Sequence, residues 1–138
     1  MPRKKISDPA LTPLELEIMN VLWETGPANV QCVQSNLKSR ELAYTTVQTM
    51  LNVLHRKGRV KRLLKNRTYI YRPVLSRQKA VTQAVGEMLD RFFGGSADGL
   101  LLNLVETRHL TPEKLARIQE MIDHPESERP KEDTHGNN

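Results

Sequence analysis

The amino-acid sequence predicts a mainly α protein, with a winged helix-turn-helix domain followed by a region of three further helices. Three observations lead to this prediction. Segments with helical apolar spacing precede residue 58, two short runs of strand-forming residues joined by a basic turn follow them, and three more amphipathic segments lie beyond residue 75. Three helices followed by a basic hairpin is the element order of a winged helix.

The first helix is expected to begin directly after Thr12. Thr12 can cap the helix, Pro13 suits the first helical position because no N–H is needed there, and the Glu15 carboxylate can reach back to the cap N–H. Gly26 and Pro27 are expected to end it.

A short second helix is expected after Asn29 and a third from about Ala43 to Lys57, with Gly58 as its C-cap. Residues 59–64 and 68–72 are expected to form two strands, closed by Pro73. The buried stripe of the third helix consists of Val47, Met50, Leu51 and Leu54.

Three helices are expected after residue 75, with starts near Ser76, Ser96 and Thr111. The apolar stripe of the first of them, which runs to Phe93, is too wide for an isolated surface helix. The exposed Val, Leu and Phe side chains after Ala80 must be buried by a partner, and a two-fold related copy is the commonest one. The sequence therefore predicts a basic arm over residues 1–10, a winged helix over 11–75, a dimerisation region over 76–124 and a disordered tail over 125–138. The expected dimer contacts are Val85, Met88, Leu89, Phe92, Phe93, Leu100, Leu101, Leu104, Leu115, Ile118 and Ile122.

Positive charge is concentrated in the middle of the chain. Ten Lys and Arg residues and no Asp or Glu lie between Leu42 and Gly86. The rest of the chain holds all 16 acidic residues and only eleven of the 21 basic ones, so the net charge of +5 conceals a strongly basic region. Such a region attracts a polyanion, and nucleic acid is the usual one.

The exposed face of the third helix is uncharged and rich in hydrogen-bonding groups. A helix-turn-helix protein lays this helix in the major groove of DNA, where Gln48 could bind adenine and a threonine methyl could pack on thymine. The alternative is an ordinary polar surface, but such surfaces favour Lys and Glu over Thr. The predicted base contacts are Tyr44, Thr45, Thr46, Gln48, Thr49 and Asn52, and the predicted phosphate and wing contacts are Arg56, Lys57, Lys61, Lys65, Asn66 and Arg67.

Other functional classes find little support in the sequence. No apolar run approaches eighteen residues, and the N-terminus has no hydrophobic segment of a secretory signal, so we expect a cytoplasmic protein without membrane insertion. The lone Cys32 cannot form an internal disulfide, and its role is left open. The four His residues have no ligand spacing, and no nucleophile–base pair or Gly-rich phosphate loop occurs. We expect no metal, no cofactor and no enzymatic activity.

Three motifs have a familiar pattern: LELEIM at 14–19 with Leu22 and Trp23, TTVQTML at 45–51 continuing to Lys57 and Gly58, and YIYRP at 69–73. Through these motifs, the chain from about residue 11 to 123 resembles the penicillinase-repressor (BlaI/MecI) family of bacterial regulators. It implies a homodimeric repressor that binds inverted repeats in promoters through its third helix. It also implies that Arg56, Lys65 and Arg67 contact the DNA backbone.

The resemblance leaves the inducing signal open. In β-lactam-responsive members a protease, linked to a sensor, cuts the dimerisation region after an Asn that precedes a Phe. LLNLV at 101–105 is similar to that site, but Leu104 replaces the aromatic residue after Asn103. The alternative is that Asn103 merely sits on a helix between core leucines. Copper-responsive relatives carry a C-terminal cysteine cluster, which this chain lacks.

Two other functions compete with sequence-specific repression. A nonspecific architectural DNA- or RNA-binding protein could use the same basic surface, although the uncharged Thr/Gln face and the lack of stacking aromatics disfavour it. A module that binds an acidic protein through its hairpin is the third possibility, and it predicts no affinity for duplex DNA.

Overall fold

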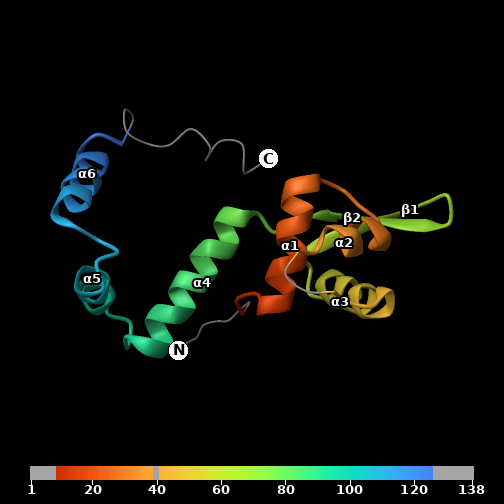
Figure 1. The fold of residues 1–138 in the computed structure, drawn as a ribbon, viewed down its shortest axis with the longest axis horizontal. Helices are drawn as coiled ribbons and strands as arrows, with labels where there is room; N and C mark the ends of the chain where they lie inside the picture. Colours follow the sequence, from red (N-terminus) through yellow and green to blue (C-terminus); the bar gives the residue numbers. More distant parts are fainter. Residues whose placement is uncertain (1–8, 39–40, 126–138) are drawn as a thin grey trace. The chain divides into compact units, whose positions relative to one another are not determined.

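A computed structural model describes residues 9–38 and 41–125 of the protein. It confirms the predicted fold class, a winged helix followed by three more helices (Figure 1). The elements in chain order are α1 (Pro13–Thr25), α2 (Val30–Asn36), α3 (Tyr44–Arg56), β1 (Val60–Lys65), β2 (Thr68–Pro73), α4 (Arg77–Phe92), α5 (Ala97–Glu106) and α6 (Pro112–Asp123).

The start of α1 has the predicted capping box. Thr12 Oγ1 accepts a hydrogen bond from Glu15 N at 3.2 Å, and Glu15 Oε1 accepts one from Thr12 N at 2.9 Å. Pro13 occupies the first turn, and Gly26 ends the helix with a φ of 82°, in the left-handed region that glycine adopts readily.

The second and third helices also lie where the sequence places them. Asn29 caps α2 by accepting a hydrogen bond from Cys32 N. The predicted C-cap of α3 is off by one residue: Lys57 is the cap, and Gly58 follows it with a φ of 78°. Such a glycine turns the chain away from the helix, and here it leads into β1.

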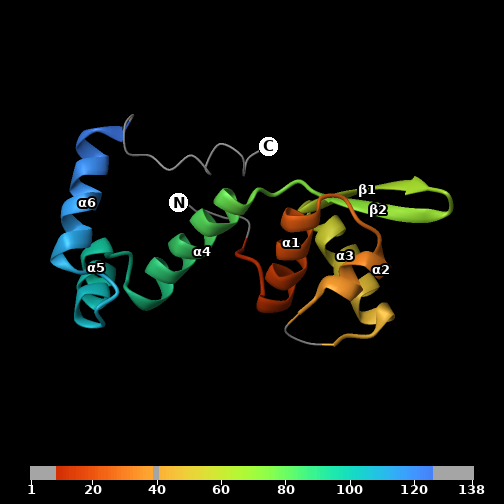
Figure 2. The same cartoon turned by 45° about the horizontal axis from the view of Figure 1, so that its top comes forward.

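The hairpin is longer than predicted and its turn is shorter. β1 and β2 are antiparallel and pair from Val60↔Pro73 to Lys65↔Thr68, so only Asn66 and Arg67 remain in the turn. In both views the hairpin extends beyond the helices (Figures 1 and 2). A short bridge that was not predicted from the sequence joins Ala28 and Tyr71, which exchange backbone hydrogen bonds at 2.8 and 2.9 Å. The bridge ties the α1–α2 connection to the hairpin.

The hydrophobic core of the winged helix combines side chains from α1, α2, α3 and the hairpin. The packing continues past the hairpin to Leu75 and to Ala80 in the first turn of α4. The indole Nε1 of Trp23 donates to the Leu75 carbonyl at 2.9 Å, and the Arg77 guanidinium lies over the Trp23 ring. The central members are Ile18, Met19, Leu22, Val33, Val47, Leu51, Leu54, Val60 and Tyr71.

The described chain forms two compact units, one spanning Ala10–Ala80 and the other beginning at Val81. The first turn of α4 therefore packs with the winged helix, later than the sequence-based boundary at residue 75. Between residues 81 and 125 only Leu110 is buried. The predicted basic arm and C-terminal tail lie almost wholly outside the described residues. Within the described residues, no helix is long and apolar enough to cross a membrane.

Candidate nucleic-acid interface

Helix α3 has one buried face and one exposed, uncharged face. Val47, Leu51 and Leu54 are completely buried in the core. Tyr44, Gln48 and Asn52 follow one another at intervals of four residues, which places them in one row along the helix. All six predicted base contacts have exposed side chains: Tyr44, Thr45, Thr46, Gln48, Thr49 and Asn52.

The N-terminus of α3 has no side-chain cap. Ala43 occupies the cap position, and its methyl group cannot accept the hydrogen bonds that Thr12 and Asn29 accept at the starts of α1 and α2. No cap therefore neutralises the positive end of the α3 dipole. The same helix carries the exposed, uncharged face.

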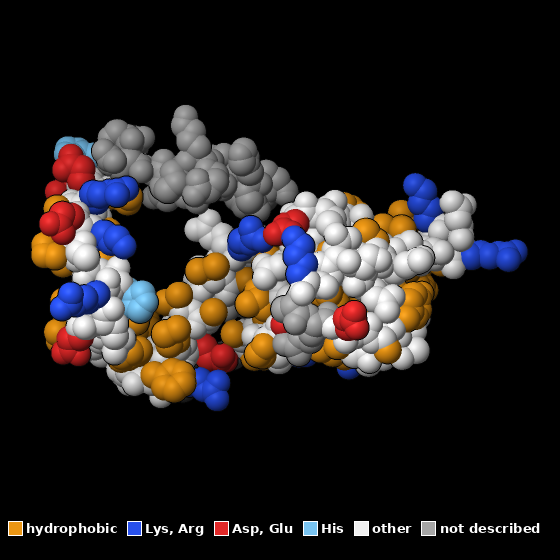
Figure 3. All heavy atoms as spheres, in the orientation of Figure 1, with side chains coloured by type: hydrophobic (Ala, Val, Ile, Leu, Met, Phe, Trp, Pro, Cys, Tyr) orange, Lys and Arg blue, Asp and Glu red, His pale blue; other side chains and the backbone are white. Residues whose placement is uncertain are grey.

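The predicted cationic contacts flank α3 and continue along the hairpin. Arg56 is the last residue of α3, Lys61 lies on β1, and Lys65 is the last residue of β1. Figure 3 shows blue basic side chains at the far end of the hairpin. Arg56, Lys61, Lys65, Asn66 and Arg67 are all exposed.

Lys57 differs from the other predicted phosphate contacts, because its ammonium is bound within the domain. Its Nζ lies 2.8 Å from Oε2 of Glu15, whose side chain is only 2% exposed. Burial raises the pKa of Glu15, but the hydrogen bonds from Lys57 and from Thr12, with the Lys57 charge, outweigh it and lower that pKa below its ordinary value. Lys57 thus neutralises the buried Glu15 carboxylate. This carboxylate would compete with a DNA phosphate for the Lys57 ammonium.

Asn52 is bonded to the hairpin through its side-chain carbonyl. Its Oδ1 accepts hydrogen bonds from Arg62 Nη1 at 2.9 Å and from the Tyr71 hydroxyl at 3.2 Å. The Arg62 guanidinium also lies over the Tyr69 ring, 4.2 Å from its centroid. These contacts join the exposed face of α3 to one face of the hairpin.

Arg62 was not among the residues that the sequence predicts to contact DNA. The alternation of side chains along β1 could have indicated that Arg62 points inward. Arg62 lies on the same face of the strand as Val60, which is buried. An arginine on the inward face of a strand needs partners there. Only the register of the hairpin against α3 shows that these partners are Asn52 and Tyr69.

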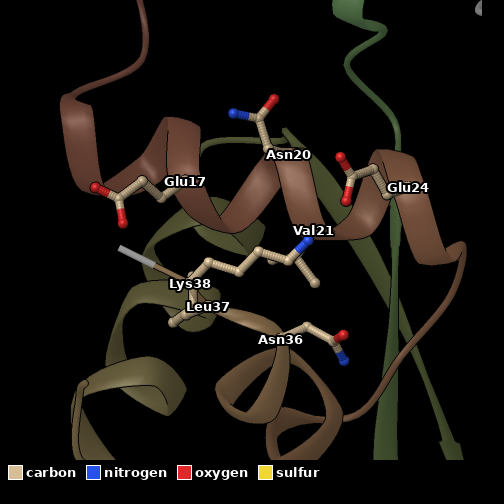
Figure 4. A pocket seen from close by; sticks show the side chains of 7 residues that line it. All are labelled: Glu17, Asn20, Val21, Glu24, Asn36, Leu37 and Lys38. Carbon is tan, nitrogen blue, oxygen red and sulfur yellow. The ribbon is translucent and has the colours of Figure 1, made fainter. Parts of the chain in front are cut away.

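A small pocket lies between α1 and the end of α2 (Figure 4). Glu17, Asn20 and Glu24 line it from α1, and the Lys38 side chain extends across it. Its volume of about 170 Å³ is below the roughly 300 Å³ of typical small-ligand sites. None of the predicted DNA contacts lines it.

The predicted dimer contacts vary in exposure within the single chain. Phe92 and Ile122 are 77% and 66% exposed, whereas Leu89, Phe93, Leu100 and Leu104 are half-buried. Phe93 packs against Gly99, where an added Cβ would lie 3.1 Å from its ring. The remaining predicted contacts are exposed: Val85, Met88, Leu101, Leu115 and Ile118.

Asn103 and Leu104, the residues of the possible cleavage site, lie inside α5. Asn103 is exposed and Leu104 is half-buried. Cys32 is half-buried on α2 beside the core. Within the described residues, no group of His, Cys, Asp and Glu side chains has the arrangement of a metal site.

Comparison with known proteins identifies similar sequences over most of the chain. Residues 11–124 match the family profile described as "Penicillinase repressor". The penicillinase repressor of Bacillus licheniformis is 28% identical over 121 residues, 87% of this chain and 93% of the relative. The transcriptional regulator BlaI of Mycobacterium tuberculosis (strain H37Rv) is 36% identical over 99 residues, 67% of this chain and 70% of the relative.

Among solved structures, the solution structure of the monomeric form of Bacillus licheniformis BlaI in complex with the blaP half-operator is 30% identical. The match covers 53% of this chain and 90% of that chain, with a TM-score of 0.45.

Proposed function

Because the chain belongs to the penicillinase-repressor family, we propose that it represses transcription by binding inverted-repeat operators in promoter DNA as a homodimer. The observation that carries the DNA-binding part is the exposed face of α3. Six uncharged hydrogen-bonding side chains lie there, in a part of the chain that has ten basic residues and no acidic one.

In this proposal α3 lies in the major groove and reads bases through Thr and Gln side chains. Gln48 offers a donor and an acceptor together, the pattern that pairs with adenine, and Thr methyl groups can contact thymine. Arg56, Lys61, Lys65 and Arg67 bind phosphates beside the groove and thereby position the helix. The uncapped N-terminus of α3 adds a favourable field for phosphate.

The second unit supports dimerisation because it leaves its apolar side chains uncovered. Ten of the sixteen exposed large hydrophobic residues in the described chain lie from Val81 onward. Orange apolar side chains are visible along α4 in Figure 3. Helices α5 and α6 contain no buried residue, so their own packing supplies little of the stability that such short helices require. A second copy of the chain would cover these faces.

A two-fold dimer presents two copies of α3 related by symmetry. Its operator is therefore an inverted repeat whose half-sites are separated by one or two helical turns. Each monomer alone holds half of the contacts, so loss of the dimer greatly weakens binding to the operator.

The test is a selection of genomic fragments with the purified full chain at physiological salt, followed by sequencing of the bound DNA. An enriched inverted repeat is the expected result, with affinity for it falling steeply as salt increases. Equal recovery of scrambled duplexes, or a preference for RNA, would contradict sequence-specific repression and favour nonspecific nucleic-acid binding. No duplex affinity would favour a protein partner for the hairpin.

We also propose that cleavage between Asn103 and Leu104 lifts repression. The support is that Asn103 is exposed and that α5 buries no residue, so local unfolding of α5 would give a protease access to the bond. Cells treated with a β-lactam should then accumulate a fragment that ends at Asn103. Loss of repression while the chain stays intact would reject cleavage as the mechanism.

A further inference from the structure

Arg62 is held in a defined position between α3 and the hairpin. Its Nη1 donates to Asn52 Oδ1 at 2.9 Å, and its guanidinium lies 4.2 Å from the centroid of the Tyr69 ring. An exposed arginine loses side-chain entropy when it binds a ligand, whereas these contacts have already restricted Arg62. Arg62 is half-buried, so part of its surface remains available to a ligand.

The same contacts determine what Asn52 can offer to DNA. A side-chain carbonyl has two lone pairs, and those of Asn52 are used by Arg62 and by the Tyr71 hydroxyl. The exposed end of the amide is therefore its NH₂ group, which only donates. Pairing with adenine requires both the oxygen and the nitrogen of the amide, so Asn52 would have to break two bonds to read adenine.

Asn52 and Arg62 together form a small surface that donates hydrogen bonds and carries one positive charge. Arg62 has five N–H donors, of which Asn52 occupies one. No carboxylate competes for the others from the same part of the chain, because residues 42–86 contain no Asp or Glu. A donor-only cationic surface of this kind suits a phosphate, which offers several acceptor oxygens to a guanidinium.

We propose that Arg62 and the Asn52 amide bind one DNA phosphate in each half-site, at the junction of α3 and the hairpin. The proposal rests on the proposed function and adds to it a specific positioning contact. Tyr69 and Tyr71 act as positioning residues, since Tyr69 supports the guanidinium and Tyr71, only 1% exposed, orients the Asn52 amide from the core. The bound phosphate fixes the register of α3 in the groove.

The experiment measures binding of the full chain to its selected operator and to operators in which single phosphates are replaced by uncharged methylphosphonates. The variants are Arg62→Ala, Asn52→Ala and, as a control, Arg72→Ala. Arg72 is exposed, has the same charge, and lies on the opposite face of the hairpin, paired with Lys61.

Arg62→Ala should weaken operator binding about 10- to 100-fold and reduce the salt slope by about one unit, because a preorganised phosphate contact is lost. One methylphosphonate position per half-site should weaken binding by the wild-type chain and by Arg72→Ala. The same position should have little effect on Arg62→Ala. This coupling reports contact with one phosphate, and a purely structural role of Arg62 would not produce it.

Tyr71→Phe tests the positioning role, because it removes a hydroxyl that lies in the core. It should weaken binding about threefold in the wild-type background and have no effect in Asn52→Ala, since the two residues act through one bond. Thermal unfolding of each variant identifies any loss of affinity that arises from unfolding.

Equal effects of Arg62→Ala and Arg72→Ala, or an unchanged methylphosphonate pattern in Arg62→Ala, would overturn the proposal. If base substitutions show the coupling and methylphosphonates do not, Arg62 reads a base instead. These outcomes are distinct from failure of the proposed function, in which the wild-type chain itself would show no sequence preference.

Discussion

At the residue scale, Glu15 shows how one side chain serves two structural purposes. Its carboxylate closes the capping box at the start of α1 and binds Lys57 directly beyond the end of α3. A carboxylate that is 2% exposed needs such partners, because burying an unpaired charge is strongly unfavourable. Glu15 therefore links the start of α1 to the end of α3.

The lowered pKa of Glu15 predicts a specific dependence of stability on pH. The folded pKa lies below the ordinary value of 4.5, so between the two values the unfolded chain binds more protons than the folded chain. The stabilising contribution of Glu15 is present above pH 4.5 and is lost as the pH falls through the folded pKa. Chemical unfolding followed across this range should show less acid destabilisation in Glu15→Gln than in the wild type. Glu24→Gln, at an exposed site on the same helix, should retain the wild-type profile.

Substitutions of the adjacent residues Lys57 and Arg56 should have different effects, the first on stability and the second on DNA affinity. Lys57→Met leaves the buried Glu15 carboxylate without its ammonium partner and should lower the free energy of unfolding by about 1–3 kcal/mol. Arg56→Ala, at an exposed site, should change stability little and weaken binding to all duplexes. Denaturant titrations and binding assays on both variants measure the two effects. If Lys57→Met weakens DNA binding without loss of stability, and Arg56→Ala does the opposite, Lys57 is a DNA contact.

Gln48 should contribute sequence preference. Gln48→Ala should reduce discrimination at one base pair per half-site by about 1–3 kcal/mol while leaving the salt slope unchanged. Binding assays on operators substituted at each base pair measure the change. A uniform loss across all operators would make Gln48 a backbone contact.

At the element scale, the hairpin turn combines a charged side chain with an unfavourable backbone conformation. Asn66 and Arg67 form a two-residue turn with φ values of 51° and 68°. Turns of this kind favour Asn followed by Gly, because a Cβ is disfavoured at positive φ. An arginine at this position reduces the stability of the turn and places a positive charge at the end of the hairpin.

Replacing Arg67 should therefore affect stability and DNA affinity in opposite directions. Arg67→Gly should raise the free energy of unfolding by about 0.5–1 kcal/mol, because the turn loses its backbone strain. It should also weaken binding to every duplex and reduce the salt slope. Arg67→Ala is the matched control, since it removes the charge but keeps a Cβ at positive φ. If Arg67→Gly binds as tightly as the wild type, the end of the hairpin does not contact DNA.

At the scale of the whole molecule, the two units differ in how far their apolar side chains are covered. The unit Ala10–Ala80 has a continuous core, whereas the described residues from Val81 onward bury only Leu110. Large apolar surfaces left uncovered in a single chain usually mark an interface. In the proposed repressor, the first unit binds DNA and the second holds two copies together.

The dimer is best tested at residues that are exposed in the single chain. Phe92→Asp and Ile122→Asp should produce monomers in sedimentation experiments and weaken operator binding at least about 100-fold, while each half-site is still recognised. These positions are better choices than Phe93 or Leu104, which are half-buried within the chain. Leu63→Asp, at a 67% exposed site on the hairpin, should remain dimeric. Dimers that persist in both helix variants would move the interface elsewhere.

Local chemistry made most of the elements predictable from the sequence. The caps at Thr12, Asn29 and Ser96 and the glycines that end helices act through neighbouring residues, so their effects can be read without knowledge of the fold. The exposed face of α3 was predictable for the same reason, because helical periodicity separates it from the buried stripe.

Tertiary structure decided how these elements act on one another. Nothing in the sequence near Lys57 indicates that a carboxylate 42 residues away would bind it. The Ala28–Tyr71 bridge and the contacts of Asn52 with Arg62 and Tyr71 likewise join distant segments. The sequence by itself determined the elements, their order and their charge, because these depend on interactions between near neighbours. The fold decided which donors and charges remain available to DNA, because that depends on which distant side chains have already paired.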